Sequence, residues 1–279
     1  MSEEPLVLLA RRAGVAVISL NRPRARNALD PATTDALTVQ LRALRDDETV
    51  RALVLTGAGD DFCAGGDVKA MGQGGERGPE QRRAGMARYH DLARAMAELD
   101  KPVVAAVDGV AYGAGMSLAL WADIVLVSNR VRMAMVFHRI GLVPDVGAWF
   151  TLPRVVGLQR AKELIFSARE FNAQEALGMN LALEVHPPEA LLARALEIAH
   201  SFEGASAVAM SLSKRALRAS LQTDLDTMLD MEASAQAVAG SSSYTREAVR
   251  RFAAREPAQF RWPSRAAMEF PSTPSAHTS

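Results

Sequence analysis

The segment that most constrains the fold is residues 109–115, which read Gly-Val-Ala-Tyr-Gly-Ala-Gly. Glycine has more backbone freedom to lose than any other residue, so this segment is unsuited to regular structure throughout. The apolar residues 102–107 precede it, and a second apolar stretch, residues 116–121, follows it. The pattern predicts a buried strand, then a glycine-rich turn and then a buried helix.

A second segment of the same kind lies earlier in the chain. Residues 62–69 read Phe-Cys-Ala-Gly-Gly-Asp-Val-Lys and follow the apolar residues 51–56, and we expect a helix to begin near Asp67. The first N–H groups of a helix have no partner within it, and glycine lets a ligand approach the backbone. The amides of Gly66 and Ala114 could therefore converge on one polarised oxygen, where each such donor typically lowers a barrier by ~3 kcal/mol. For either turn alone, a structural turn without a ligand explains the pattern as well.

Alternating strand and helix patterns in the first half of the chain predict an α/β core. We expect a hairpin turned at Ala13 and Gly14, followed by a helix that Asp30 caps and Pro31 begins. The further elements expected are a helix over residues 81–99, strands over residues 124–128 and 132–136, and an almost entirely helical chain beyond residue 148.

These patterns divide the chain into three parts. Residues 1–200 form the α/β core, and residues 201–262 form a helical C-terminal region. Residues 263–279 are rich in Pro, Ser and Thr, a composition that cannot bury enough apolar surface to fold. We therefore expect them to form a disordered tail.

Charge and cysteine content exclude several classes of function. The chain has 32 Lys and Arg against 32 Asp and Glu, which argues against nucleic-acid binding because that needs a basic excess. Cys63 is the single cysteine, so an internal disulfide and a cysteine-based metal site are both excluded, and we expect no bound metal. No apolar stretch is long enough to cross a membrane, and residues 1–5 do not resemble a signal peptide. A reducing, cytoplasmic setting fits these features best.

Five motifs in order resemble the crotonase superfamily, the family of enoyl-CoA hydratases and isomerases. They lie at residues 20–29, 62–69, 101–115, 122–123 and 141–147, and the resemblance covers roughly residues 6–260. It implies an α/β fold in which ββα units repeat as a spiral, with C-terminal helices that join subunits into a homotrimer or a hexamer. It also implies an acyl-CoA thioester as substrate and no separate cofactor, since coenzyme A is part of that substrate.

The resemblance also implies roles for particular residues. Gly66 and Ala114 match the two positions whose backbone N–H groups form the family's oxyanion hole, and alanine is acceptable there because the donor is a backbone group. The positions expected to contact the nucleotide or the pantetheine arm of coenzyme A are Arg24, Ala25, Arg26, Ala64, Asp67 and Val68. From the residues alone, each arginine could equally lie in a solvated loop, and Asp67 could cap the following helix.

This chain departs from the family pattern at the two positions where the hydratases carry glutamate. Ser117 and Phe137 occupy these positions, and both are candidates for substrate binding. A serine hydroxyl is a poor acid or base at neutral pH, and a phenyl ring is neither. Hydration by a pair of carboxylates is therefore not expected. The competing interpretation of Ser117 is a small residue that packs within its helix.

One carboxylate remains nearby. Asp145 lies in the loop after Phe137, with Val143, Val146 and Trp149 close to it in the sequence. Apolar surroundings raise the pKa of a carboxyl group, as proton transfer near neutral pH requires. We therefore expect Asp145 to be the acid/base of a double-bond isomerisation, in which a single group moves a proton between two carbons. The competing interpretation is that Asp145 caps a helix beginning near Val146.

Two other functions remain open. Sequences like that of 4-chlorobenzoyl-CoA dehalogenase have a histidine at the position of His90, which would activate water while Asp145 attacks an acyl or aryl group. That arrangement would make the chain a hydrolase or a dehalogenase. The loss of both glutamates could instead leave a non-catalytic CoA-binding or assembly protein. Cys63 lies beside the Gly66 turn, but with no basic partner evident in the sequence we interpret it as inert packing.

Overall fold

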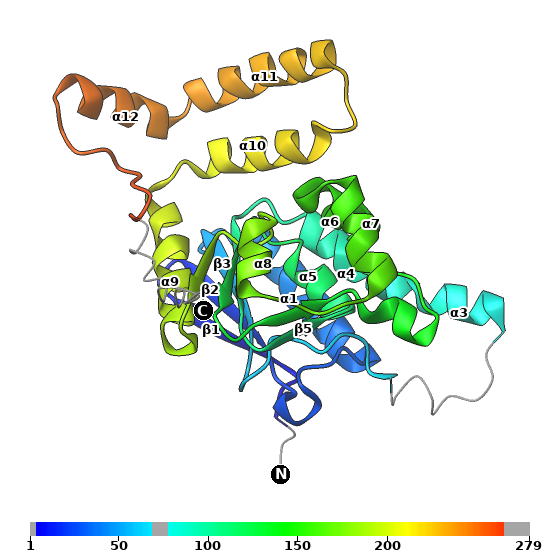
Figure 1. Ribbon diagram of the computed structural model, residues 1–279. Coiled ribbons are helices and arrows are strands. Elements are labelled where there is room, and N and C mark those ends of the chain that lie inside the picture. The colour runs from blue at the N-terminus through cyan, green and yellow to red at the C-terminus, as the bar shows by residue number, and fades with distance from the viewer. Residues whose placement is uncertain (1–3, 69–77, 265–279) are drawn as a thin grey trace, which may run out of the picture.

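A six-stranded sheet runs through the molecule (Figure 1). The computed structural model describes residues 4–68 and 78–264. In spatial order the strands are β1 (Val7–Arg12), β2 (Val15–Leu20), β3 (Ala52–Gly57), β4 (Val103–Val107), β6 (Ile124–Ser128) and β9 (Glu184–His186). The β1–β2 hairpin is antiparallel, and the other neighbours in this sheet are parallel. Parallel strands need crossover connections, which here carry the helices.

A smaller sheet continues the chain where strands of the large sheet end. It consists of β5 (Val110–Tyr112), β7 (Arg132–Ala134) and β8 (Phe171–Asn172). The chain passes from β4 to β5, and from β6 to β7, before it enters a helix. Single bridges between Cys63 and Ala111 and between Leu29 and Gly66 repeat this arrangement in the earlier part of the chain. This repeat confirms the predicted α/β spiral of ββα units.

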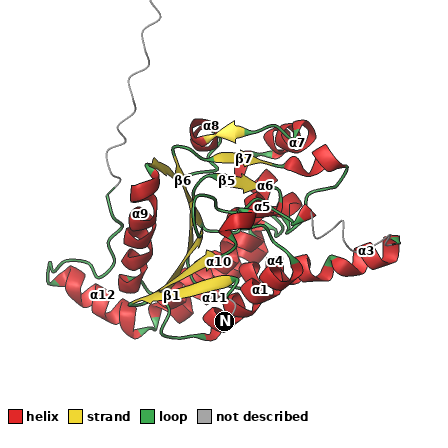
Figure 2. Ribbon diagram, turned by 90° about the horizontal axis from the view of Figure 1, so that it is seen from below, coloured by secondary structure: helices red, strands yellow, loops and turns green. Residues whose placement is uncertain are grey.

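Helices fill the crossovers and cover both faces of the large sheet. The α-helices are α1 (Pro31–Asp46), α3 (Pro79–Gly85), α4 (Ala87–Ala97), α5 (Ala114–Ala119), α6 (Ala148–Val156), α7 (Leu158–Ser167), α8 (Ala173–Gly178), α9 (Pro188–Ser201), α10 (Ala207–Ala219), α11 (Leu225–Gly240) and α12 (Ser243–Ala253). Short 3-10 helices are η1 (Pro23–Ala25), η2 (Val136–Ile140) and η3 (Phe202–Gly204). Figure 2 shows α9 on one side of the large sheet and α1, α4 and α5 on the other.

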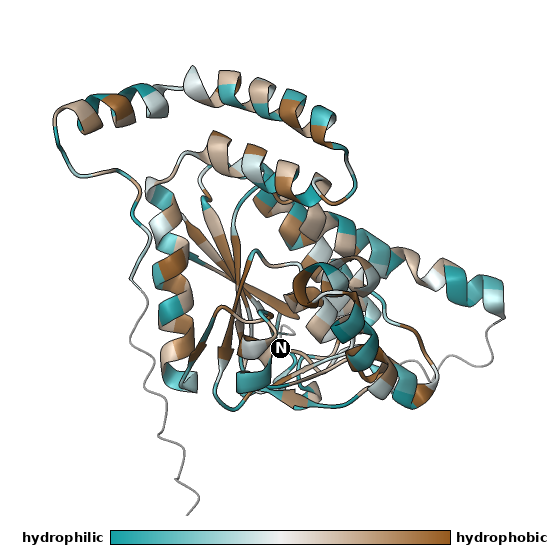
Figure 3. Cartoon of the chain, turned by 45° about the horizontal axis from the view of Figure 1, so that its top comes forward, coloured by the Kyte–Doolittle hydropathy of each residue, from teal (hydrophilic) through white to brown (hydrophobic). Residues whose placement is uncertain are grey.

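Each inner strand of the large sheet contributes to two apolar cores, because successive side chains point to opposite faces. In β3, Leu53 and Leu55 join the core under α1 and α4, whereas Val54 joins the core under α9. Strands that are buried on both faces have continuous apolar sequences, which is why these strands could be predicted from the sequence. Figure 3 shows these hydrophobic strands at the centre of the molecule.

The start of α1 follows the predicted chemistry. The Asp30 carboxylate accepts a hydrogen bond from the Thr33 N–H at 2.7 Å, and Pro31 occupies the first helical position. Leu37 and Leu41 recur at helical spacing and are fully buried. The capping residue and the apolar stripe therefore set where α1 begins and which face it buries.

The helices α10, α11 and α12 form a layer of their own above the core (Figure 1). None of their residues is buried in the single chain. On α10, Lys214 donates hydrogen bonds to Asp123 Oδ2 at 2.7 Å and to the Lys101 carbonyl oxygen at 2.9 Å. Polar contacts of this kind contribute to holding α10 against the core. From residue 265 onward, the predicted tail lies outside the described residues.

Several elements differ from the predicted ones. The helix expected over residues 81–99 is two helices that meet at Met86, just after Gly85, a poor helix former. Within the predicted turn, Val110–Tyr112 pair with β7 as a strand, and the helix begins at Ala114 rather than residue 116. The strands β8 and β9 lie in a region predicted to be helical. Both pair with strands distant in sequence, which local patterns do not reveal.

Candidate active site

The two glycine-rich turns lie against each other. The Cys63 N–H donates to the Val110 carbonyl oxygen at 2.9 Å, and the Tyr112 N–H donates to the Cys63 carbonyl oxygen at 3.0 Å. A Cβ atom on Gly65 would lie 2.6 Å from the Tyr112 carbonyl oxygen and 3.4 Å from the Ala114 nitrogen. Because Gly65 also has a φ of +94°, glycine is required for this close approach.

The N–H groups of Gly66 and Ala114 have no acceptor among the residues that the structure describes. The neighbouring residue Leu29 forms its hydrogen bonds with the residues before and after Gly66. The Leu29 N–H donates to the Gly65 carbonyl oxygen, and the Leu29 carbonyl oxygen accepts from the Asp67 N–H. Ala114 is the first residue of α5, so its N–H has no partner within the helix. Both amides therefore have a free N–H group that a ligand could bind.

Phe137 borders the Ala114 turn. A Cβ atom on Gly113, the residue before Ala114, would lie 3.5 Å from the Phe137 ring, which is 7% exposed. Ser117 is fully buried, and its hydroxyl donates to the Gly113 carbonyl oxygen at 3.0 Å. Since this bond occupies the hydroxyl within its own helix, it favours a packing role for Ser117 over contact with substrate.

Asp145 provides a carboxyl group that water reaches poorly. Its Oδ1 atom is buried and has no hydrogen-bond partner among the described residues. Burial raises the pKa of Asp145 to about 7. The following helix, α6, begins at Ala148 and has no side-chain cap, so the interpretation of Asp145 as a helix cap is wrong. A buried carboxyl group with this pKa can accept and return a proton at neutral pH.

The loop of Asp145 has an unusual backbone conformation. Val146 has a φ of +48°, a left-handed value that costs a β-branched residue of the order of 1–3 kcal/mol. Gly147 has a φ of +76°, and a Cβ atom there would lie 2.6 Å from the Trp121 ring. The Trp121 indole N–H donates to the Val146 carbonyl oxygen at 2.7 Å. Surrounding contacts therefore determine where Asp145 lies.

Tyr89 belongs to the site, although the sequence interpretation named its neighbour His90. The Tyr89 hydroxyl lies 3.5 Å from the carbonyl oxygen of Leu29, which pairs with Gly66. Burial and then the charge of Asp145 raise the pKa of Tyr89 to about 12, so its hydroxyl stays protonated. His90 is exposed, and its side chain makes no hydrogen bond or ion pair with any described residue.

A periodic signal for Tyr89 was present in the sequence. Residues 89, 92 and 96 lie on one face of α4, where Leu92 and Met96 are buried. Successive residues on a helix point about 100° apart, so His90 turns away from that face. The missed signal was the apolar stripe of α4.

Cys63 does not have the properties of a nucleophile. Its side chain is fully buried, and burial raises the pKa of the thiol to about 12. The Gly65 N–H donates to its Sγ atom at 3.4 Å. A thiol that stays protonated is inert, so the interpretation as packing is supported.

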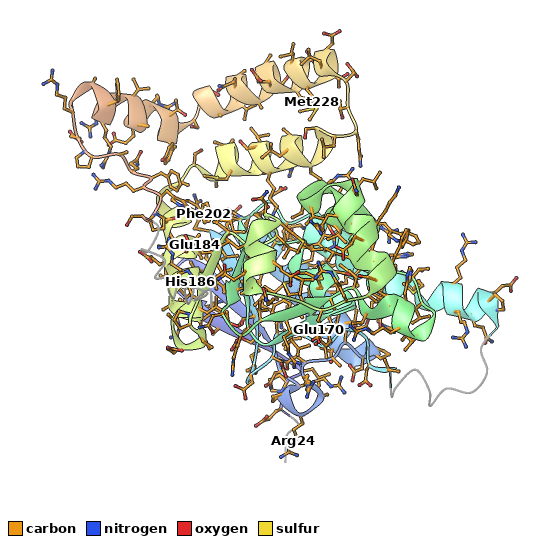
Figure 4. All side chains as sticks on the ribbon, viewed as in Figure 1. Arg24, Glu170, Glu184, His186, Phe202 and Met228 are labelled. Atoms are coloured by element: carbon orange, nitrogen blue, oxygen red, sulfur yellow. The ribbon has the colours of Figure 1, made fainter. Side chains whose placement is uncertain are left out.

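The arginine segment lies beside the Gly66 turn. The Ala64 N–H donates to the Arg26 carbonyl oxygen at 2.8 Å, which joins η1 to that turn. Arg24 extends away from the core in Figure 4, and the side chains of Arg24 and Arg26 are exposed. Ala25 is half-buried, and Val68 is 57% exposed. These side chains could meet a phosphorylated ligand from solvent.

Asp67 has a partner that the sequence did not predict. Its carboxylate lies 3.0 Å from an Arg22 guanidinium nitrogen, and the same nitrogen lies 3.3 Å from Asp30. Arg22 thus connects the Gly66 turn to the cap of α1.

Over residues 4–68 and 78–264, no three histidine, cysteine, aspartate or glutamate side chains gather in a way that could hold a metal ion. Within the same ranges, no helix has the length and apolar character needed to cross a membrane.

Known proteins match both the sequence and the fold. The family model of enoyl-CoA hydratase/isomerase matches residues 10–263. The 1,2-epoxyphenylacetyl-CoA isomerase of Escherichia coli is 36% identical over 252 residues, which cover 88% of this chain and 95% of that protein. A probable enoyl-CoA hydratase of Rhodobacter capsulatus is 39% identical over 251 residues, which cover 88% of this chain and 94% of that protein.

The crystal structure of an enoyl-CoA hydratase/isomerase from Cupriavidus metallidurans superposes with a TM-score of 0.90 at 41% identity. The match covers 95% of this chain and 100% of that chain. The spiral fold, the family match and these relatives agree. The chain is therefore an enzyme of the enoyl-CoA hydratase/isomerase family, within the crotonase superfamily.

Proposed function

We propose that this enzyme moves a double bond along the acyl chain of a CoA thioester by transferring a proton between two carbons. The thioester oxygen accepts hydrogen bonds from the Gly66 and Ala114 N–H groups, and Asp145 is the acid/base. The observation that carries the proposal is the Asp145 carboxyl group, whose Oδ1 atom is buried without a partner among the described residues. Its pKa of about 7 lets it take up and release a proton at neutral pH.

The reaction balances with one proton and no other reactant. The Asp145 carboxylate removes a proton from the carbon next to the thioester carbonyl of a 3-enoyl-CoA. The electron pair of the broken C–H bond moves into the conjugated system, and negative charge develops on the thioester oxygen between the two N–H groups. The Asp145 carboxylic acid then protonates the γ-carbon, which leaves a 2-enoyl-CoA and restores the carboxylate.

Hydration fits this set of residues less well. Adding water across a double bond requires one group to activate the water and another to protonate the carbon. Ser117 and Phe137 occupy the two positions where the resemblance implies glutamate in the hydratases. The buried Ser117 hydroxyl is bonded to the Gly113 carbonyl oxygen at the start of its own helix, and the Phe137 ring is an apolar group beside the Ala114 turn. Both features favour isomerisation.

We place coenzyme A along the arginine segment. Arg24 and Arg26 bind the nucleotide phosphates, and the pantetheine arm passes Ala25, Ala64 and Val68. The exposed guanidinium groups and the bond between Ala64 and Arg26 support this placement. Asp67 contributes through its ion pair with Arg22, which orders the turn. No separate cofactor is needed, because hydrogen bonds alone stabilise the oxyanion.

We also propose a homotrimer, or a hexamer of two trimers, assembled through α10, α11 and α12. Large apolar side chains on these helices are exposed in the single chain, with Leu217, Leu225 and Phe252 at 72%, 71% and 87%. Exposed apolar groups of this extent usually mark an interface. We place the enzyme in the cytoplasm, the reducing setting that suits a chain with one free, buried cysteine.

A panel of 2-enoyl-, 3-enoyl-, 3-hydroxyacyl- and aryl-CoA thioesters tests the reaction. We expect a 3-enoyl-CoA to be converted to the 2-enoyl-CoA, with kcat/KM rising as pH increases through about 7, because the base is the carboxylate. Asp145→Asn should lower kcat by at least about a hundredfold, in the range typical of general acid–base catalysis. Conversion at the wild-type rate by Asp145→Asn would rule out the proposed mechanism.

The same panel of thioesters, tested with the wild-type enzyme, separates the alternatives. If Asp145 were a nucleophile, rapid quenching during turnover of an aryl-CoA would leave an ester on Asp145, visible as added mass. His90 is exposed and its side chain has no polar partner among the described residues, so it gives that route no support. Binding of every thioester without turnover would instead support a non-catalytic CoA-binding protein.

A further inference from the structure

Trp121 connects the helix of one oxyanion amide to the loop of the proposed acid/base. α5 begins at Ala114 and ends at Ala119, and Trp121 follows it by two residues. The Trp121 indole N–H donates to the Val146 carbonyl oxygen at 2.7 Å, across 25 residues of sequence. Val146 is the residue directly after Asp145. One short helix therefore carries Ala114 at its start and the support of the Asp145 loop just beyond its end.

The Trp121 ring is itself held in place. It stacks on Phe150 of α6, with ring centroids 5.8 Å apart and planes 13° from parallel. Gly147 packs so closely on the indole that a Cβ atom would lie 2.6 Å from the ring. The backbone N–H of Trp121 donates to the Leu118 carbonyl oxygen at 3.2 Å, which holds the main chain that carries the ring. An indole donor whose ring is packed on Phe150 and Gly147 can impose a geometry on the loop that it contacts.

The loop needs such support. Val146 is fully buried at a φ of +48°, which a β-branched residue rarely adopts. A residue in this region stays there only when its surroundings determine its conformation. The indole hydrogen bond acts on the carbonyl group of Val146 itself, so it restrains the Val146–Gly147 peptide, which begins at the residue after Asp145.

We propose that Trp121 is a positioning residue, whose indole N–H holds Val146 in its left-handed conformation and thereby keeps the Asp145 carboxyl group buried in the site. This inference rests on the proposed function of Asp145. Trp121 acts through its hydrogen bond to Val146 and, in this proposal, contacts neither the substrate nor the reacting atoms. Without the bond, the loop relaxes and the carboxyl group gains contact with water.

Trp121→Phe tests the proposal because it keeps an aromatic ring and removes the N–H donor. With a 3-enoyl-CoA as the probe, we expect kcat to fall by about 10- to 100-fold, as small displacements of catalytic groups do. KM should stay within about twofold, because the groups assigned to bind coenzyme A are unchanged. The inflection of kcat/KM against pH should move to lower pH, because a solvated carboxyl group ionises more easily.

Two other variants complete the test. Val146→Gly changes the residue that accepts the hydrogen bond and gives its backbone more conformational freedom. It should therefore move the pH profile in the same direction. It also keeps the proposal testable if Trp121→Phe does not fold. Trp262→Phe makes the same chemical change at a 44% exposed tryptophan near the C-terminal end, and it should leave kcat and the pH profile unchanged.

The outcomes distinguish this inference from the proposed function. If Asp145→Asn is inactive while Trp121→Phe and Val146→Gly keep the wild-type pH profile, the positioning role is wrong and the acid/base role stands. A loss of kcat in Trp121→Phe without any change in the pH profile also overturns positioning of the carboxyl group. If Asp145→Asn remains fully active, the proposed function fails first, whatever Trp121→Phe does.

Discussion

At the scale of single residues, the proposed chemistry depends on how poorly Asp145 is solvated. Desolvation by burial is the dominant cause of its raised pKa. Tyr89 and Cys63 lie close enough that the charge of Asp145 contributes to raising the pKa of each. The two neighbours are held in their neutral forms at neutral pH. Asp145 is therefore the group in this trio that changes charge near pH 7.

The raised pKa of Asp145 predicts a pH-dependent cost in stability. The folded protein binds the Asp145 proton more tightly than the unfolded chain does. The stabilisation that this protonation gives is therefore fully present below the ordinary pKa of 3.8 and is lost as pH rises through about 7. Asparagine does not titrate. Measured against wild type at the same pH, Asp145→Asn should therefore be more stable to unfolding at about pH 8.5 than at about pH 5, by about 2 kcal/mol. Urea unfolding at both values measures this, and equal differences at the two pH values would contradict the buried carboxylate.

Tyr89 and His90 provide a second prediction at this scale. Tyr89→Phe removes the hydroxyl beside Leu29 and should lower kcat/KM by about two- to tenfold, the size of one lost hydrogen bond. His90→Ala should leave kcat/KM within about twofold, because the exposed imidazole has no polar partner among the described residues. Steady-state kinetics with a 3-enoyl-CoA compares the two. A larger loss of kcat/KM in His90→Ala than in Tyr89→Phe would indicate that His90, rather than Tyr89, belongs to the active site.

At the scale of elements, β9 is held at the edge of the large sheet by a buried charge cluster. Arg194 of α9 binds both Glu184 carboxylate oxygens at 2.8 Å, and His186 lies 2.8 Å from one of them. Figure 4 shows Glu184 and His186 close together beside α9. Glu184 and Arg194 are 2% and 6% exposed, so this pair joins the last strand to the helix that covers it.

Removing the cation from this cluster should be costly. Arg194→Met leaves the Glu184 carboxylate buried without its main partner, and we expect the free energy of unfolding to fall by about 3–5 kcal/mol. Chemical denaturation measures the change. The double variant Glu184→Gln with Arg194→Met should recover part of the loss, because it removes the buried charge. A double variant no more stable than Arg194→Met would show that packing, rather than charge, is responsible.

At the scale of the whole molecule, the single chain leaves a layer of helices without a partner for its apolar side chains. The core closes its own two faces, whereas α10, α11 and α12 meet it through contacts such as the Lys214–Asp123 ion pair. Figure 3 shows hydrophobic stretches along these helices. Burial against other copies of the chain would stabilise this layer by about 25 cal/mol for each Å² of apolar surface removed from water.

Charged substitutions on this layer should change the mass of the assembly. Phe252→Glu combined with Leu217→Glu places two charges where we expect subunits to meet, and sedimentation equilibrium should show a shift from trimer toward monomer. Val39→Glu makes a matched change at a 62% exposed residue of α1 and should leave the mass unchanged. A monomeric wild type, or a trimer that survives both charges, would contradict the proposed interface.

Much of this protein was determined by the sequence alone, where the physical cause is local. Asp30 and Pro31 set the start of α1 because a carboxylate cap and a proline act within one turn. Gly66 and Ala114 were identified because turns between apolar strands and helices leave amides unbonded, and the order of motifs indicated the family. Asp145 was named because the family resemblance places its loop just after the second missing glutamate, and because apolar residues flank it in the sequence.

The tertiary structure decided which side chains meet. Tyr89 rather than His90 lies at the Gly66 turn because packing of α4 selects one helix face. Trp121 reaches Val146, and β9 joins β6, across 25 and 58 residues of sequence respectively. Such contacts arise only when successive turns of the spiral stack and remove apolar surface from water. Their energy comes from the whole core, so no local pattern in the sequence records them.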